Sequence, residues 1–233
     1  MANFWERYSR SRSAVLGLVI LGLVIFMAAI ANFVFPEDPF RLVGIPMSLP
    51  GTNGFLLGSD TLGRDVAAGI AHGAKTSIMI GLIATLTSVF IGVIFGAFAG
   101  YYGGRADDLL MRITEIFQTI PSFVFAILLV AIMKPSIESI VIAITVVSWP
   151  GVARLVRGEF LALKNREFVQ ACHTLGMGDF RIMLREMLPN CLSPIIVIGS
   201  LMVATAILIE SGLAFLGLGD PNIMSWGFQI GAG

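Results

Sequence analysis

The sequence of 233 residues is 56% hydrophobic and only 13% charged, and its formal net charge is zero. No soluble domain of this size buries so much apolar surface, so the composition indicates a membrane protein with several spans. The absence of a net positive charge argues against nucleic acid as a partner. The two cysteines, Cys172 and Cys191, have neither a CxxC nor a zinc-ligand spacing, so no disulfide framework or metal site is expected.

The first predicted span follows a polar lead at residues 1–13. Residues 14–35 carry no charge and are long enough to cross a hydrocarbon layer of about 30 Å. A cleavable signal peptide is the alternative, because Ala29-Ile30-Ala31 resembles a cleavage site. The apolar run, however, is longer than the ~7–15 residues of a signal-peptide core, which favours an uncleaved span.

A loop rich in proline and glycine comes next and, with a lead-in helix, is predicted over 36–76. Its last part, GIAHGAKT at 69–76, differs from a phosphate-binding P-loop in having Ala74 in place of the second glycine. That glycine lets backbone amides wrap a phosphate, and a preceding β-strand is also needed. Neither condition is met, so we expect no nucleotide site here.

The core of the protein is predicted over 77–217. In its first span, Gly92, Gly96 and Gly100 lie on one helical face, which allows another helix to approach closely in lipid. Pro121 is expected to kink the next span. Four spans are predicted in this core, followed by a tail at 218–233; the spans are 77–101, 114–133, 137–152 and 194–217.

The basic residues predict the orientation of the chain, because cytoplasmic segments of membrane proteins are enriched in Lys and Arg. A cytoplasmic N-terminus places eleven of the fifteen Lys and Arg residues in the cytoplasm. The segment 153–193 is then a cytoplasmic loop, whereas 36–76 and 218–233 are extracytoplasmic. The eleven residues are Arg7, Arg10, Arg12, Arg105, Arg112, Arg154, Arg157, Lys164, Arg166, Arg181 and Arg185.

Within the cytoplasmic loop, residues 166–190 predict two short amphipathic helices. Gly176 and Gly178 separate them, Asp179 is expected to cap the second, and Pro189 is expected to stop it. Such a helix-turn-helix suits docking into a partner's groove, and the alternative is a helix pair lying on lipid headgroups. The expected apolar faces are Phe168, Cys172 and Leu175 on the first helix, and Phe180, Met183, Leu184 and Met187 on the second.

This stretch resembles the EAA loop of ABC-importer permeases, which has an acid-Ala-Ala triplet, a glycine four residues later, an Ile and a closing Leu-Pro. The triplet here is Gln170-Ala171-Cys172, which departs from that pattern at two places. Three further segments resemble permeases of the dipeptide, oligopeptide and nickel importers, namely GSDTLGRD at 58–65, GYYGGRADDLLMR at 100–112 and ESGLAFLGLGDPNIMSW at 210–226. The resemblance implies an ATPase-docking surface that includes Glu167, Gln170, Ala171, Cys172, Gly176, Ile182, Leu188 and Pro189.

The resemblance also implies the fold and the assembly. The expected fold is an all-α polytopic bundle of the type I ABC importer permease kind, located in a prokaryotic inner membrane. The chain would form half of the translocation path for peptides or a similar small solute. Implied partners are a second homologous permease subunit, two cytoplasmic ATPase subunits, an extracytoplasmic solute-binding protein and the lipid bilayer. ATP and Mg would bind to the ATPase subunits, so this chain is expected to be neither an enzyme nor a cofactor-binding protein.

Members of that family typically have six spans, whereas five are visible here, so a sixth span is expected to be missing from this sequence. It would pack on the glycine face at Gly92, Gly96 and Gly100 or on the span at 194–217.

Glu210 interrupts the apolar run at 194–217. Acids within a membrane are costly and usually face protein or water, so Glu210 either lines the translocation path or is a structural partner for a donor in the other permease subunit. A secondary transporter that works without an ATPase is the alternative function. That class tends to show internal repeats and several polar groups at the membrane midplane, and neither is evident in this sequence.

Overall fold

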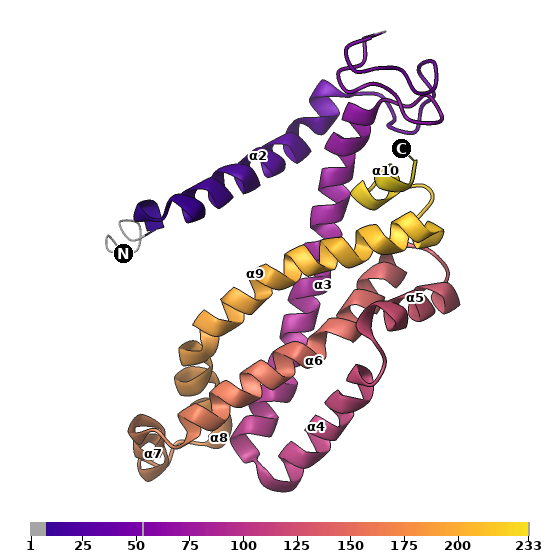
Figure 1. Cartoon of the computed structure of the whole chain (residues 1–233). Helices are drawn as coiled ribbons and strands as arrows, with labels where there is room; N and C mark the ends of the chain where they lie inside the picture. Colours follow the sequence, from indigo (N-terminus) through magenta and orange to yellow (C-terminus); the bar gives the residue numbers. More distant parts are fainter. Residues whose placement is uncertain (1–7, 53, 233) are drawn as a thin grey trace. The chain divides into compact units, whose positions relative to one another are not determined.

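The computed structural model describes residues 8–52 and 54–232 and is built from helices (Figure 1). Four of the described helices are long and apolar enough to cross a membrane, and there are five spans if the bent pair α4–α5 counts as one. The prediction of an all-α polytopic membrane protein is confirmed. The elements are α2 (Arg12–Val34), α3 (Val66–Tyr102), α4 (Gly104–Gln118), α5 (Ser122–Met133), α6 (Ile137–Lys164), α7 (Glu167–Thr174), α8 (Asp179–Ile182), the π-helical segment η1 (Met183–Met187), α9 (Leu188–Leu213), the π-helical segment η2 (Ala214–Leu218) and α10 (Trp226–Ala232).

The first of two compact units combines the residues up to Ile78 with those from Pro221 onward. Its α2 corresponds to the predicted first span, and Ala31 is the one residue of this helix that is buried. The side chains of α2 are otherwise largely exposed and apolar, as expected of a helix whose surroundings are lipid or another protein.

The loop before α3 packs against α10 within this unit. Thr61 donates a 2.6 Å hydrogen bond to the backbone carbonyl of Ala232. The guanidinium carbon of Arg64 lies 5.5 Å from the centroid of the Phe228 ring, a cation–π arrangement. The segment 58–65, singled out by resemblance, therefore packs against the last helix of the described chain.

The helix α3 begins at Val66, well before the predicted start of the second span at 77. The stretch at 69–76 consequently lies inside a helix, where its backbone amides are used in helical hydrogen bonds and cannot wrap a phosphate. Gly73 serves packing instead, because a Cβ there would lie 3.0 Å from the backbone of Trp226. The rejection of a P-loop is confirmed.

In the second unit, Met79–Asp220, α6 packs against α4, α5 and α9. Figure 1 shows α6 lying between α4 and α9. One core cluster contains Val152, Val156 and Phe160 of α6, and the other contains Ile140 and Ile144 of the same helix. Because α6 contacts α4, α5 and α9 and contributes to both clusters, it is the central helix of this unit. It extends to Lys164, beyond the predicted end of the fourth span at 152.

The predicted glycine face on α3 is the contact with α6. A Cβ on Gly92 would lie 2.5 Å from the Cβ of Val152, and a Cβ on Gly100 would lie 2.6 Å from that of Phe160. A Cβ on Gly96 would clash with the backbone carbonyl of Ala153. Close approach of another helix is confirmed, and the expectation that this face is an open seam for a sixth helix is wrong, because α6 covers it.

The predicted third span, 114–133, is broken rather than merely kinked. The helices α4 and α5 meet at an angle of 78°. Pro121 stands at the N-cap of α5, with φ −53° and ψ 128°, and its carbonyl accepts the N–H of Phe125 at 2.9 Å. The ring of Trp149 packs edge-to-face on Phe117 beside this break, with centroids 5.3 Å apart.

The prediction that Pro189 stops the second docking helix is wrong. Residues 179–216 form one helical run through η1 and α9 into η2, which ends where Gly217 takes a left-handed conformation with φ +79°. Pro189 lies in the first turn of α9, directly after the π-helical turn η1. A proline has no backbone N–H to donate, and a first helical turn is the place where a helix tolerates that loss. Asn190 donates a 2.6 Å hydrogen bond to the carbonyl of Glu186, which satisfies a backbone group near this turn.

Candidate functional site

The first predicted docking helix is present as α7, and it ends in the expected glycine turn. Gly176 has φ +73°, a left-handed conformation that residues with a Cβ adopt at a cost. The N–H of Gly176 donates to the carbonyl of His173 at 3.0 Å, and the N–H of Met177 donates to the carbonyl of Cys172 at 3.1 Å. These paired bonds close the end of α7 and reverse the chain toward α8.

The second docking helix begins with a different cap from the one predicted. Gly178 is the N-cap residue of α8, and no side chain caps the helix. Asp179 instead accepts a 2.8 Å hydrogen bond from the hydroxyl of Tyr101, near the C-terminal end of α3. A carboxylate in the first turn of a helix is also favoured by the helix dipole. Asp179 therefore fixes α8 to α3 rather than capping α8.

Two further contacts of Tyr101 fix the same region. Its ring stacks on that of His173 with centroids 6.3 Å apart, and the ammonium of Lys164 lies 6.0 Å from its centroid. Tyr101 is only 4% exposed. One buried aromatic side chain thus contacts the end of α6, the end of α7 and the start of α8.

The buried sides of the docking helices belong to the core cluster of the second unit that contains Phe160. Val169 and Cys172 of α7 pack there with Ile182, Met183 and Met187. Val152, Val156 and Phe160 of α6 lie in the same cluster. The helix pair is consequently held by apolar burial, so a displacement of α7 and α8 has to move α6 or disrupt this core.

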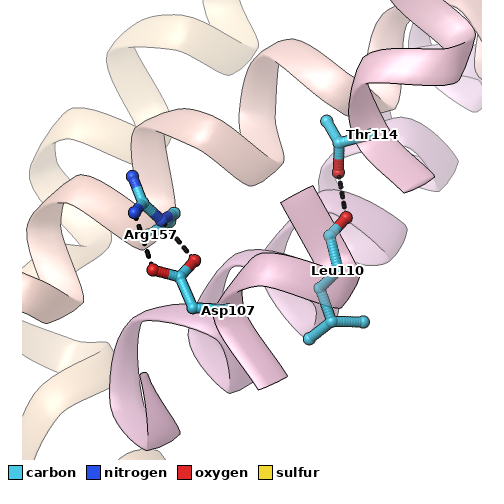
Figure 2. Close-up of polar contacts among 4 residues, drawn as sticks. All are labelled: Asp107, Leu110, Thr114 and Arg157. Atoms are coloured by element: carbon cyan, nitrogen blue, oxygen red, sulfur yellow. Dashed lines mark hydrogen bonds and ion pairs between the residues drawn. The ribbon is translucent and has the colours of Figure 1, made fainter. Parts of the chain in front are cut away.

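An ion pair fastens α4 to α6 at the same end of the second unit. Figure 2 shows the carboxylate of Asp107 facing the guanidinium of Arg157. Arg157 Nε donates to Asp107 Oδ1 at 2.5 Å, and Arg157 Nη2 donates to Oδ2 at 2.6 Å. This bidentate geometry is the strongest that the two groups form. Thr114, fully buried on α4, donates to the carbonyl of Leu110 at 2.8 Å (Figure 2).

The residues expected at the docking surface fall into two groups. Glu167, Gln170, Ala171, Gly176 and Pro189 are exposed. Cys172 is buried, Ile182 is fully buried and Leu188 is partly buried, so these three face the core of their own chain. A contact between any of these residues and a partner stays a prediction.

The predicted apolar faces of the two helices are covered only in part by the rest of the chain. Leu175 is 79% exposed and Phe180 is 63% exposed, so these two members of the predicted apolar faces are not covered by their own chain. Val169, which the pattern did not assign to a face, is fully buried. Periodicity in so short a helix gives a face only to within one residue, so only the contacts in the folded chain decide which side is covered.

Glu210 is 1% exposed within α9, and the hydroxyl of Ser211 donates to its carboxylate at 3.5 Å. Glu210 is thus covered by its own chain, and both the role in the translocation path and the pairing with a donor in another subunit stay predictions. Among the residues that the structure describes, no group of three or more His, Cys, Asp and Glu side chains is placed to hold a metal ion.

The broken α4–α5 pair, the long spans and the helix-turn-helix define a polytopic helical membrane protein with a short helix pair between two spans. The chain belongs to the family of binding-protein-dependent transport system inner membrane components, whose sequence model matches residues 92–231. A second model, the N-terminal TM domain of oligopeptide transport permease C, matches residues 1–49.

Individual relatives agree with this assignment. The chain is 41% identical to the dipeptide transport system permease protein DppC of Bacillus subtilis over 98% of this chain and 72% of that protein. It is 37% identical to the oligopeptide transport system permease protein OppC of the same organism, over 97% of this chain and 75% of the relative. The resemblance to ABC-importer permeases of the dipeptide and oligopeptide branch is confirmed.

A solved structure supports the fold. A chain of the MetNI methionine ABC transporter, in an inward-facing conformation, superposes with a TM-score of 0.57 at 16% sequence identity. The match covers 66% of this chain and 77% of that one. The expected permease architecture is therefore confirmed.

Proposed function

We propose that this chain is the transmembrane subunit of an ATP-driven importer, and that it forms half of the translocation path for peptides or a similar small solute. Family membership supports the transport role, and the named dipeptide and oligopeptide permeases among the relatives support the solute class. These comparisons support the ATP-driven reading rather than the secondary transporter.

The observation that carries the coupling part of the proposal is the exposed turn of α7. Glu167, Gln170 and Gly176 are exposed there beside Leu175, while Tyr101 holds the other side of the helix pair to the bundle. A rigidly supported surface with an apolar anchor suits a partner's groove. We infer that ATPase subunits bind this surface and that their ATP- and Mg-dependent closure moves α6 through the shared core.

The proposed assembly contains a second, homologous permease subunit, two ATPase subunits and an extracytoplasmic binding protein. The N-terminus and the 153–193 loop lie in the cytoplasm. The basic residues support this orientation, because eleven of the fifteen then lie on the cytoplasmic side. ATP and Mg are held by the ATPase subunits, and the chain itself carries no catalytic residue in this scheme.

Reconstitution in proteoliposomes tests the transport proposal. Co-expressed with its neighbouring genes, the chain is expected to support uptake of a labelled dipeptide only with ATP and the binding protein, and to stimulate ATP hydrolysis. Uptake driven by a proton gradient without an ATPase subunit would instead establish the secondary transporter.

Thiol labelling tests the orientation. The native Cys172 and Cys191 are 9% and 0% exposed, so they give little background. A Leu175→Cys variant presents an exposed thiol, which a membrane-impermeant reagent is expected to modify in inside-out but not in right-side-out vesicles prepared without the ATPase subunits. Modification in sealed right-side-out vesicles contradicts the proposed topology.

A further inference from the structure

An apolar hollow lies beside the docking helices and has no role in the proposed coupling. Its volume is about 240 Å³, and every residue that lines it is apolar. Its walls come from α3, α6, α8, η1 and α9, and they include Ile94, Phe98, Phe160, Phe180, Met183 and Leu184. The hollow is therefore a gap between packed helices of the second unit rather than a feature of one loop.

Two arginines stand at the edge of this hollow. Phe180 and Leu184 also line a second, open depression of about 400 Å³, whose remaining walls are Arg181 and Arg185. Arg181 and Arg185 are one helical turn apart, and both are exposed. Within residues 8–52 and 54–232, neither guanidinium forms an ion pair with a carboxylate. Of the nearby acids, Asp179 is hydrogen-bonded to Tyr101 and Glu186 is partly buried.

The hollow continues an exposed apolar stripe on α3. Phe90, Ile94 and Phe98 follow one another at one-turn spacing and are 67%, 40% and 37% exposed. They belong to a helix long and apolar enough to cross the membrane. The proposed topology leaves this stripe open to acyl chains and places the arginines at its cytoplasmic end.

We propose that this site binds an anionic phospholipid, with one acyl chain in the hollow and the phosphate on Arg181 and Arg185. Charge complementarity selects the occupant: a cytoplasmic leaflet supplies anionic headgroups, and basic pockets between spanning helices bind them. A wholly apolar wall adjoining two guanidinium groups matches an amphipathic lipid better than a soluble anion, which gains nothing from the hollow. The site would tie lipid composition to the position of α8 and η1.

The test uses the assembled importer in nanodiscs of phosphatidylcholine that contain a phosphatidylglycerol with a photoactivatable acyl chain. Adducts are expected on the walls of the hollow, mapped by mass spectrometry of the digested chain. The paired substitution Arg181→Gln and Arg185→Gln is expected to lower the adduct yield about thirtyfold, from the contribution of each basic residue near an anionic headgroup.

The matched control is Arg105→Gln with Arg112→Gln, which removes the same charge from two exposed residues of α4. It is expected to leave the yield unchanged. A Leu184→Trp variant, which fills the hollow and keeps both arginines, is expected to lose the acyl adduct, so the proposal does not depend on the arginine variants alone. Excess inorganic phosphate is expected to leave the yield unchanged, because an ion does not compete for the hollow.

Three results overturn the proposal: adducts that do not depend on Arg181 and Arg185, adducts absent from the assembled importer, or cross-links from this face to an ATPase subunit instead of lipid. The inference relies on the proposed topology, but its readout is lipid retention rather than uptake. A failed lipid test with intact ATP-driven uptake rejects this site alone, and a failed uptake test with intact lipid adducts rejects the transport proposal alone.

Discussion

The hydroxyl of Tyr101, near the end of α3, donates a 2.8 Å hydrogen bond to the carboxylate of Asp179, the first residue of α8. The two residues are 78 positions apart in the chain. This bond joins the glycine-packed α3–α6 pair to the docking helices through a side chain that is itself buried. We therefore regard Tyr101 as the residue that holds the first turn of α8 against α3.

The first prediction removes this bond. Tyr101→Phe keeps the ring contacts with His173 and Lys164 but loses the hydroxyl, so it is expected to lower the free energy of unfolding by about 1.5 kcal/mol. Stimulated ATP hydrolysis is expected to fall more than basal hydrolysis, because α8 is no longer fixed to α3. Thermal unfolding in detergent and ATPase assays in proteoliposomes measure the two effects.

Tyr102→Phe is the matched control for this substitution. Tyr102 is the adjacent residue, is 48% exposed and stacks on Phe98 through its ring. It is expected to show neither effect, and an equal loss in both variants would contradict a specific role of the bond between Tyr101 and Asp179.

The second prediction concerns the turn between the docking helices. Gly176 and Gly178 both have open space where a Cβ would be placed, but Gly176 has φ +73° and Gly178 has φ −70°. Gly176→Ala is therefore expected to cost about 1 to 2 kcal/mol through backbone strain. Gly178→Ala carries no such strain.

With membrane insertion unchanged, Gly176→Ala is expected to reduce ATP-driven uptake severalfold while Gly178→Ala retains it. Gly176→Asn is expected to be milder than Gly176→Ala, since asparagine tolerates the left-handed region better. Uptake that is equal in all three variants at equal expression would show that the geometry of this turn does not matter for coupling.

The features predicted correctly from the sequence are local ones. The end of α7 depends on one glycine and its neighbours, and the glycine face of α3 depends on residues four apart, so both can be read from a short window. The partner of that face could not be read, because nothing in Gly92 or Gly96 indicates that α6 covers it.

The errors concern residues whose role is decided by distant contacts or by a competing backbone geometry. Aspartate is a preferred N-cap residue, yet the carboxylate of Asp179 accepts a hydrogen bond from Tyr101 instead. Proline commonly ends a helix, yet the helix continues through Pro189 because a π-helical turn precedes it. A single sequence gives the local preference of each residue, but it does not show which of several possible interactions forms in the folded chain.

The third prediction tests the ion pair between α4 and α6. The side chain of Asp107 is 13% exposed and that of Arg157 is 36% exposed. Arg157→Gln leaves the carboxylate without its bidentate partner and is expected to cost about 2 kcal/mol, less than the loss of a fully buried pair because water reaches Arg157. Chemical or thermal unfolding of the purified importer measures the loss.

A double-mutant cycle isolates the pair itself. If Asp107 and Arg157 act through each other, Asp107→Asn adds little to the effect of Arg157→Gln. Glu115→Gln, at an exposed position of the same helix, is the control and is expected to leave unfolding unchanged. Fully additive effects of Asp107→Asn and Arg157→Gln would mean that the two groups contribute separately.

The fourth prediction concerns the contact between α3 and α6. A Cβ on Gly96 would meet the carbonyl of Ala153, which belongs to a helix backbone and cannot rotate away. Gly96→Ala is therefore expected to push the helices apart and to destabilise the protein by about 1 to 3 kcal/mol, the usual cost of overpacking.

Gly158→Ala on α6 is the control, because nothing lies within 4 Å of the Cβ it introduces. Alanine is also the better helix former, so this variant is expected to be as stable as the parent or slightly more so. A loss of stability in Gly158→Ala equal to that in Gly96→Ala would contradict the packing seen here, since the two substitutions differ chiefly in what the new methyl group touches.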